Sequence, residues 1–255
     1  MTKIVTLVMV GIISTAVGIS VHAAGGGKTP PAHQWSHSGL FGTFDRASLR
    51  RGAKVYREVC SACHGLRLVA YRNLMDIGFS EAEVKAIASE QEVAAEPNDD
   101  GDVEMRPAIL SDRFVSPFPN ENAARAANGG AYPPDLSLMV KARPGGANYL
   151  RGLLIGYKEE PPEGVIVPEG MNYNEYYAGN MIAMASPLSE DGVEFADGTK
   201  ATVEQMANDV TTFLSWTAEP ELEERKRMGI KVILFLLILT GLLYVVKRRI
   251  WSDLH

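Results

Sequence analysis

The most reactive side chains of the sequence lie together at Cys60-Ser61-Ala62-Cys63-His64. Cys60 and Cys63 are the only two cysteines among the 255 residues. Two thiols separated by two residues can add to the two vinyl groups of a haem, and a histidine that follows directly can ligate its iron. The motif occurs once. The sequence therefore predicts one covalent haem c, attached to Cys60 and Cys63, with His64 as an axial ligand of the iron.

Three other uses of this cysteine pair have less support. A thioredoxin-like redox pair is expected near a βαβ unit, and no such pattern surrounds Cys60. A disulfide across two residues would close a very small loop and constrain little. A zinc site would need a second pair of ligands, and no further cysteine exists. The remaining histidines are scattered, at His22, His33, His37 and His255.

The second axial ligand is expected from a loop downstream of the motif. Methionine opposite histidine is typical of a high-potential electron carrier, whereas an open position is typical of gas binding or catalysis. Met184 lies among small residues, at 179–187, whose backbone could approach a haem face closely. A methionine there could equally fill a gap in the core. The residues alone leave open Met171, Met181 and Met184, with Met105 and Met139 as weaker candidates.

The two ends of the chain predict how this motif is positioned in the cell. Lys3, an apolar stretch at 4–21 and small residues before position 24 are typical of a cleaved secretory signal peptide, predicted here over residues 1–24. The alternative is a retained anchor. Such a leader implies that the following domain, residues 25–220, is exported.

A second apolar block runs over residues 229–246 and is long enough to cross a bilayer. Lys231, near its start, can extend its charge to the interface. The cluster 247–249, Lys-Arg-Arg, follows directly and fixes that end on the cytoplasmic side. A buried core helix is the alternative, but it would rarely end in such a cluster. Residues 221–255 are therefore predicted to be a transmembrane anchor with a short cytoplasmic tail. The haem domain would face the periplasm of a bacterial inner membrane.

Two helices are predicted around the haem motif. Asp45 is a suitable N-cap for a helix over residues 45–60, which places apolar side chains on one face and ends at the motif. Ser80 and Glu83 form a capping-box pattern at the start of a second helix, over residues 80–92.

The rest of the exported domain is rich in loops. Thr202 and Gln205 form another capping-box pattern before a helix, and Pro220 marks a break before the anchor. Residues 93–200 contain most of the prolines and glycines and show little periodicity. A loop region of that length is uncommon unless something other than a regular core organises it, and a buried cofactor would do so. The expected fold is mainly α, with long loop insertions.

The charge balance excludes one class of partner. The net charge of −6 and the lack of a basic patch in the domain argue against nucleic acid. Acidic residues gather between 90 and 104 and again between 159 and 169. Either group could attract a basic cytochrome c, although a solvated loop is the more common explanation of such runs.

Beyond the haem motif, the sequence resembles the cytochrome c1 family, the haem subunit of the cytochrome bc1 complex, of the type found in alphaproteobacteria and mitochondria. The resemblance covers roughly residues 34–252 and rests on several separate motifs. These are Trp35-Ser36-His37, Gly39-Leu40-Phe41, Arg50-Arg51-Gly52, Val55 to Cys60, Val69 to Leu74, Ala123 to Asn128, Pro133 to Ser137, Ala218-Glu219-Pro220 and Arg225 to Gly229.

The resemblance implies roles for individual residues and a class I c-type cytochrome fold. The family's distal loop matches residues 179–187 and places its iron ligand at Met184 rather than Met181. Arg143 and Tyr149 match family residues that bind the haem propionates, a role in which arginine supplies a fork of donors. Five further residues match haem-packing positions, although ordinary core or turn roles would also explain them: Pro133, Pro134, Leu153, Tyr177 and Pro187.

The family also implies a function. Its members carry one electron from the Rieske iron–sulfur protein to cytochrome c, bound to the cytochrome b subunit and to membrane lipid, and are not enzymes by themselves. The rival function is a membrane-anchored c-type cytochrome subunit of a terminal oxidase or nitric oxide reductase. Two departures are visible: no cysteines remain for the extra disulfide of some bacterial relatives, and the chain lacks a long acidic N-terminal extension. The ordinary signal peptide favours a bacterial origin.

Overall fold

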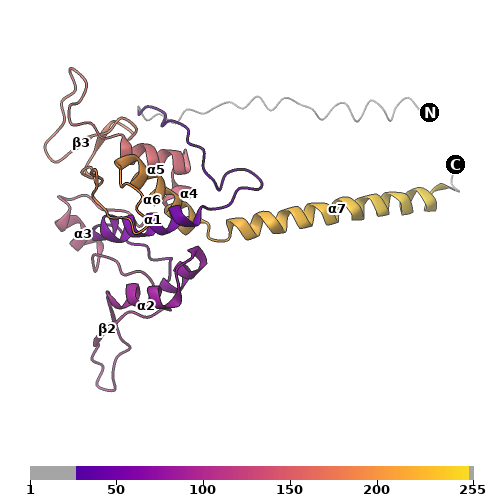
Figure 1. Cartoon of the computed structure of the whole chain (residues 1–255), viewed down its shortest axis with the longest axis horizontal. Helices are drawn as coiled ribbons and strands as arrows, with labels where there is room; N and C mark the ends of the chain where they lie inside the picture. The colour runs from indigo at the N-terminus through magenta and orange to yellow at the C-terminus, as the bar shows by residue number, and fades with distance from the viewer. Residues whose placement is uncertain (1–26, 253–255) are drawn as a thin grey trace.

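The computed structural model describes residues 27–252. They form a helical domain from which one long helix projects (Figure 1). This confirms the prediction of a mainly α fold with long loop insertions and one C-terminal helix able to cross a membrane. The predicted signal peptide lies outside the described residues.

Two helices far apart in the sequence form the centre of the domain, and two shorter helices pack on the second of them. They are α1 (Arg46–Glu58), α6 (Val203–Ala218), α4 (Met139–Ala142) and α5 (Gly146–Ile155). Gly52 allows α1 to lie very close to α6. A Cβ atom at this position would lie 2.0 Å from the carbonyl oxygen of Asp209 and 2.7 Å from the Cβ atom of Phe213. Any side chain at position 52 would therefore push the two helices apart.

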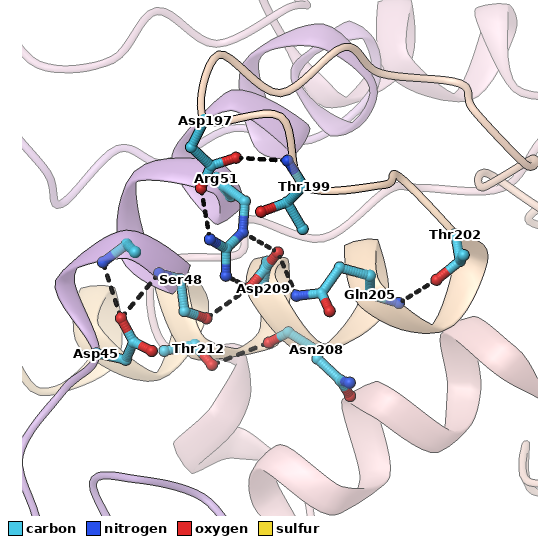
Figure 2. A network of polar contacts seen from close by, with 11 residues as sticks. Asp45, Ser48, Arg51, Asp197, Thr199, Thr202, Gln205, Asn208, Asp209 and Thr212 are labelled. Atoms are coloured by element: carbon cyan, nitrogen blue, oxygen red, sulfur yellow. Dashed lines mark hydrogen bonds and ion pairs between the residues drawn. The ribbon is translucent and has the colours of Figure 1, made fainter.

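A polar network joins the same two helices (Figure 2). The carboxylate of Asp209, a residue only 1% exposed, accepts hydrogen bonds from the Arg51 guanidinium at 2.7 and 3.1 Å. Ser48 and Gln205 donate to it at 2.7 and 2.9 Å, and Arg51 also donates to Asp197 at 2.7 Å. The hydrogen bond to Asp209 is the main reason why the pKa of Arg51 is raised. The Arg51 guanidinium is therefore held in its charged form against Asp209.

The helix starts on either side of the haem motif are as predicted. Asp45 caps α1 by accepting from the backbone N–H groups of Ala47 and Ser48. The helix ends at Glu58, and a 3₁₀ turn, η1 (Cys60–Ala62), follows it. The next predicted helix is α2 (Glu81–Ser89), and both hydrogen bonds of its capping box between Ser80 and Glu83 are present. It ends earlier than predicted, because the chain turns into strand β1 at Glu92.

The third capping box is only half formed. Thr202 accepts from the backbone N–H of Gln205, as expected, and caps α6. The Gln205 side chain donates instead to the buried Asp209. α6 ends before Pro220, and α7 (Leu222–Ile250) begins after it, as predicted.

The loop-rich region contains more structure than the sequence indicated, because helices α3, α4 and α5 were not predicted. All three are short, and α5 begins beside two glycines with positive φ. Of the acidic residues between positions 90 and 104, Glu90 is the C-cap of α2 and pairs with Arg57, whereas the others lie on the exposed hairpin β1–β2. Those between 159 and 169 lie in the loop after α5. The remaining elements are η2 (Tyr71–Ile77), α3 (Glu121–Ala127), and the antiparallel pairs β1–β2 (Glu92–Ala94, Met105–Pro107) and β3–β4 (Asn172–Tyr173, Met181–Ile182).

The segment before α1 contains a histidine in an apolar setting. The His37 ring stacks on Phe44 at 4.7 Å, and its Nδ1 atom is buried without a hydrogen-bond partner. Burial, with a smaller contribution from the charge of Lys226, lowers the pKa of His37 from 6.5 to about 4. The folded state therefore favours the neutral ring.

Acidification is expected to destabilise the domain through His37. The unfolded chain binds a proton near pH 6.5 and the folded chain only near pH 4, so the free energy of unfolding should fall as the pH drops through this window. A His37→Phe variant should show a shallower slope between these pH values. The measurement is denaturant unfolding of both proteins over that range. Parallel curves would contradict the assignment.

Candidate haem-binding site

The two cysteines lie on the turn that follows α1. The backbone N–H groups of Cys63 and His64 both donate to the carbonyl of Cys60, at 3.1 and 2.9 Å. Both thiols are free and half-buried. Burial, and to a lesser extent the neighbouring Cys63, raises the pKa of Cys60 to about 12. A redox-active cysteine needs a lowered pKa, so this environment argues against a thioredoxin-like pair.

His64 is oriented for metal binding by a backbone carbonyl. Its Nδ1 atom lies 2.7 Å from the carbonyl oxygen of Pro134. A carbonyl can only accept, so Nδ1 must carry the proton, and Nε2 keeps the lone pair that a metal requires. Burial lowers the pKa of His64, opposed by the Pro134 hydrogen bond and the charge of Asp135, which favours the neutral ring. The Tyr56 hydroxyl donates to the backbone carbonyl of His64 at 2.9 Å.

The segment 133–137 is fastened to the residues that follow the haem motif. The Leu136 N–H donates to the Gly65 carbonyl at 2.9 Å, and the Arg67 N–H donates to the Asp135 carboxylate at 2.8 Å. These bonds hold Pro134 against His64. The structure thus brings together Cys60, Cys63, His64, Pro133 and Pro134.

The predicted distal methionine lies in a loop whose backbone is held by two side chains. The carbonyl of Met184 accepts from the Tyr157 hydroxyl at 3.0 Å and from the Asn172 amide at 3.3 Å. Met184 itself is half-buried. Met181 lies in β4, paired with Tyr173. The loop around Met184 is therefore fixed by contacts from outside its own sequence.

Tyrosine and arginine side chains lie near this loop. Burial raises the pKa of Tyr149, Tyr177 adds to the rise, and the charge of Arg143 opposes it. Tyr149 also contributes to the raised pKa of Tyr157, after burial. Arg143 is exposed and donates to the Ala142 carbonyl at 3.3 Å. The predicted propionate ligands Arg143 and Tyr149 thus interact electrostatically with each other, and Tyr149 interacts in the same way with Tyr157, which donates to the Met184 carbonyl.

Asn174 organises this group and was not predicted from the sequence. It is fully buried. Its amide donates to the Leu153 carbonyl at 2.8 Å, and its oxygen accepts from the N–H groups of Tyr176 and Tyr177 at 3.0 and 3.2 Å. The signal in the sequence was an asparagine within a tyrosine-rich loop. Pro187 is half-buried just beyond Met184.

The site residues thus form two groups, one around His64 and one around Met184. Between positions 27 and 252, no hydrogen bond or ion pair joins the two groups directly. Within the same range, no cluster of three or more His, Cys, Asp or Glu side chains could hold a metal ion, which gives the zinc alternative no support. Two free thiols, a histidine with a free Nε2 and a downstream thioether are the donors that a c-type haem requires.

A sequence model of the Cytochrome C1 family matches residues 35–254. The chain belongs to this family. It is 54% identical over 232 residues to the mitochondrial cytochrome c1 haem protein of Saccharomyces cerevisiae, covering 91% of this chain and 75% of that protein. It is 46% identical over 270 residues to cytochrome c1 of Rhodospirillum rubrum, covering 99% of each. A protein of Bradyrhizobium diazoefficiens named cytochrome b/c1 is 47% identical over 272 residues, which are 98% of this chain and 40% of that protein.

Family membership confirms three predictions. The cofactor is a c-type haem, with Cys60 and Cys63 present for its attachment. The fold is that of a c-type cytochrome with loop insertions, and α7 is its single membrane-crossing candidate in the described part of the chain. The role of the chain is electron transport rather than thiol chemistry. The attachment of haem at Cys60 and Cys63 and the roles of His64, Met184, Arg143, Tyr149 and the packing residues stay predictions.

Proposed function

We propose that this chain is the mono-haem electron carrier of a quinol–cytochrome c reductase, the bc1 complex. It takes one electron from the Rieske iron–sulfur protein and delivers it to cytochrome c, while the cytochrome b subunit and lipid surround its anchor. The chain makes and breaks no substrate bond, so it is not an enzyme by itself. The names of its relatives, which include a cytochrome b-c1 complex catalytic subunit of Candida albicans, support this assignment.

The observation that carries the proposal is the hydrogen bond between His64 Nδ1 and the Pro134 carbonyl. It leaves Nε2 as a strong donor to iron and prevents the ring from rotating. The haem, when bound, supplies an iron that changes oxidation state by one electron. Cys60 and Cys63 would hold it covalently, and His64 and Met184 would ligate its iron. Arg143 and Tyr149 would bind the propionates, and Pro133, Pro134, Leu153, Tyr177 and Pro187 would pack around the ring.

The proposed topology follows from both ends of the chain. Residues 1–24 are a signal peptide that is removed, and residues 25–220 face the periplasm of a bacterial inner membrane. α7 carries Lys247, Arg248 and Arg249 in its last turn, which supports a cytoplasmic C-terminus for the segment 221–255. Protease added to spheroplasts is expected to degrade the haem domain. Complete protection of that domain would contradict the orientation.

A difference spectrum of the purified protein tests the function. The protein is tagged, extracted from its own membranes in mild detergent, and compared in the dithionite-reduced and oxidised states. A c-type band accompanied by b-type bands is expected, because the bc1 complex contains both haem types. A c-type band alone would remove the support for a bc1 complex and favour an oxidase or nitric oxide reductase subunit. The absence of a haem band would overturn the assignment entirely.

The acidic hairpin β1–β2 allows a test of docking to cytochrome c. Asp99, Asp100 and Asp102 are exposed at its tip, and the Asn98 side chain holds the turn by accepting from two backbone N–H groups. Changing the three aspartates to asparagine should therefore keep the turn and remove only charge. We expect slower reduction of cytochrome c at low salt and no difference at high salt. Equal salt dependence in variant and parent would show that the hairpin is only a solvated loop.

A further inference from the structure

The segment between Trp35 and Phe44 exposes two large apolar side chains. Leu40 is 58% exposed and Phe41 is 79% exposed. They follow Gly39, whose φ of +72° turns the chain. Residues 38–44 carry no charged side chain. We call the pair Leu40–Phe41 the apolar tip. The packing of the haem domain does not explain why these two apolar side chains are exposed.

The first turns of α7 hold the loop on both sides of the apolar tip. The Lys226 ammonium donates to the carbonyls of His37 and Gly42, at 2.7 and 3.1 Å. The Glu223 carboxylate accepts from the backbone N–H of Phe44 at 2.8 Å and from the Arg46 guanidinium at 2.9 Å. The position of the loop is therefore fixed relative to the anchor helix.

This attachment sets the depth of the apolar tip in a membrane. Lys226 precedes Ile230, near the start of the apolar part of α7, by four residues, which is about 6 Å along a helix. The headgroup layer on each side of a bilayer is roughly 5–8 Å thick. The loop is thus held at the level of the headgroups. In Figure 1 the indigo segment before α1 extends on the side of the domain from which α7 leaves.

We propose that Leu40 and Phe41 insert into the lipid surface beside α7 and give the haem domain a second membrane contact. A single helix leaves a domain free to tilt, whereas a second contact fixes the face that it presents to mobile partners. The apolar side chains of α7 beside the loop are exposed in the same way, as expected of a surface that faces lipid. The inference rests on α7 crossing the membrane and is independent of the proposed electron-transfer route.

The test places a nitroxide label at the apolar tip. In the haem-loaded, full-length protein, Cys60 and Cys63 are bonded to haem, so Phe41→Cys introduces the only free thiol. The labelled protein is reconstituted into vesicles of phosphatidylcholine and phosphatidylglycerol. Collision of the label with oxygen, which concentrates in lipid, and with a water-soluble nickel chelate is measured by electron paramagnetic resonance. We expect an oxygen-to-nickel collision ratio several-fold higher than at the control Ile166→Cys, which is 88% exposed in the loop between α5 and β3.

Two further labels separate the possible failures. Leu236→Cys, on the exposed apolar part of α7, must show the lipid signature, and its failure would refute the anchor rather than the tip. Adding Lys226→Gln to Phe41→Cys should raise nickel collisions, because it weakens the attachment. A Phe41 label as accessible to nickel as Ile166 would overturn the proposal. Low collision with both reagents in native membranes would also overturn it, because that result means that a protein subunit covers the tip.

Discussion

Substitution of Met184 by leucine is expected to leave the haem attached and to lower its midpoint potential by a few hundred millivolts. Attachment depends on Cys60 and Cys63, which the change does not touch. Axial ligands alone spread haem potentials over roughly 0.8 V, and a thioether opposite histidine favours the reduced iron. For one electron, each shift of about 59 mV changes an equilibrium tenfold. The variant haem should therefore be too weak an acceptor to take electrons efficiently from the Rieske protein.

The structure supplies matched controls for this prediction. Met181 lies three residues away in β4 and Met171 lies in the preceding loop, and both were open candidates from the sequence. Met181→Leu and Met171→Leu should leave the potential and the low-spin spectrum unchanged. Potentiometric titration of each purified variant decides among them. A fall in potential for Met181→Leu with no change for Met184→Leu would show that the ligand had been misassigned.

The distal loop also shows why the sequence could indicate a ligand but not the surroundings that hold it. Small residues around Met184 suggested close approach to a flat group. The two donors to its carbonyl, Tyr157 and Asn172, come from other segments, and nothing in their local sequence marks them. Asn174 is a similar case. Its side-chain amide bonds the tyrosine-rich loop to α5, and the sequence gives no sign that these two segments lie side by side.

Local signals were reliable where local physics decides the structure. Ser80 and Glu83 satisfy each other's backbone groups, so the capping box formed as predicted. Gln205 has the same place in its capping-box pattern, but it lies one helical turn before the buried carboxylate of Asp209. Its side-chain amide donates to that carboxylate instead of to the N-cap residue, because a buried charge without a donor costs more free energy. Helix α5 was missed because it lacks a side-chain cap, so its formation depends on packing against α6.

The buried pair of Arg51 and Asp209 was also invisible in the sequence, and breaking it is expected to have the largest effect on stability. Asp209→Leu should lower the free energy of unfolding by about 3–5 kcal/mol, because it removes the buried partner of the Arg51 charge and leaves only the more exposed Asp197. Arg51→Met should be similarly harmful. The double variant should recover part of the loss, since it removes both charges at once.

An exposed pair on the same helix is the matched control. Lys54 and Glu58 form an i,i+4 ion pair at 2.9 Å with side chains 36% and 45% exposed. Glu58→Gln should cost only about 0.3–0.5 kcal/mol. The measurement is denaturant unfolding of the full-length, haem-loaded protein in detergent, followed by haem absorbance. Equal losses for Asp209→Leu and Glu58→Gln would mean that the network in Figure 2 contributes little.

The same variants connect stability to function, because α1 ends directly before the haem motif. Gly52 and Arg51 lie on the face of α1 that presses on α6, so α6 fixes the position from which η1 presents Cys60 and Cys63. A loosened α1–α6 contact should therefore weaken the hold on His64 before the whole domain unfolds. We expect Asp209→Leu to show a high-spin haem fraction at denaturant concentrations where far-ultraviolet circular dichroism is still native. Simultaneous loss of both signals would show that the haem motif and the helix pair unfold as one unit.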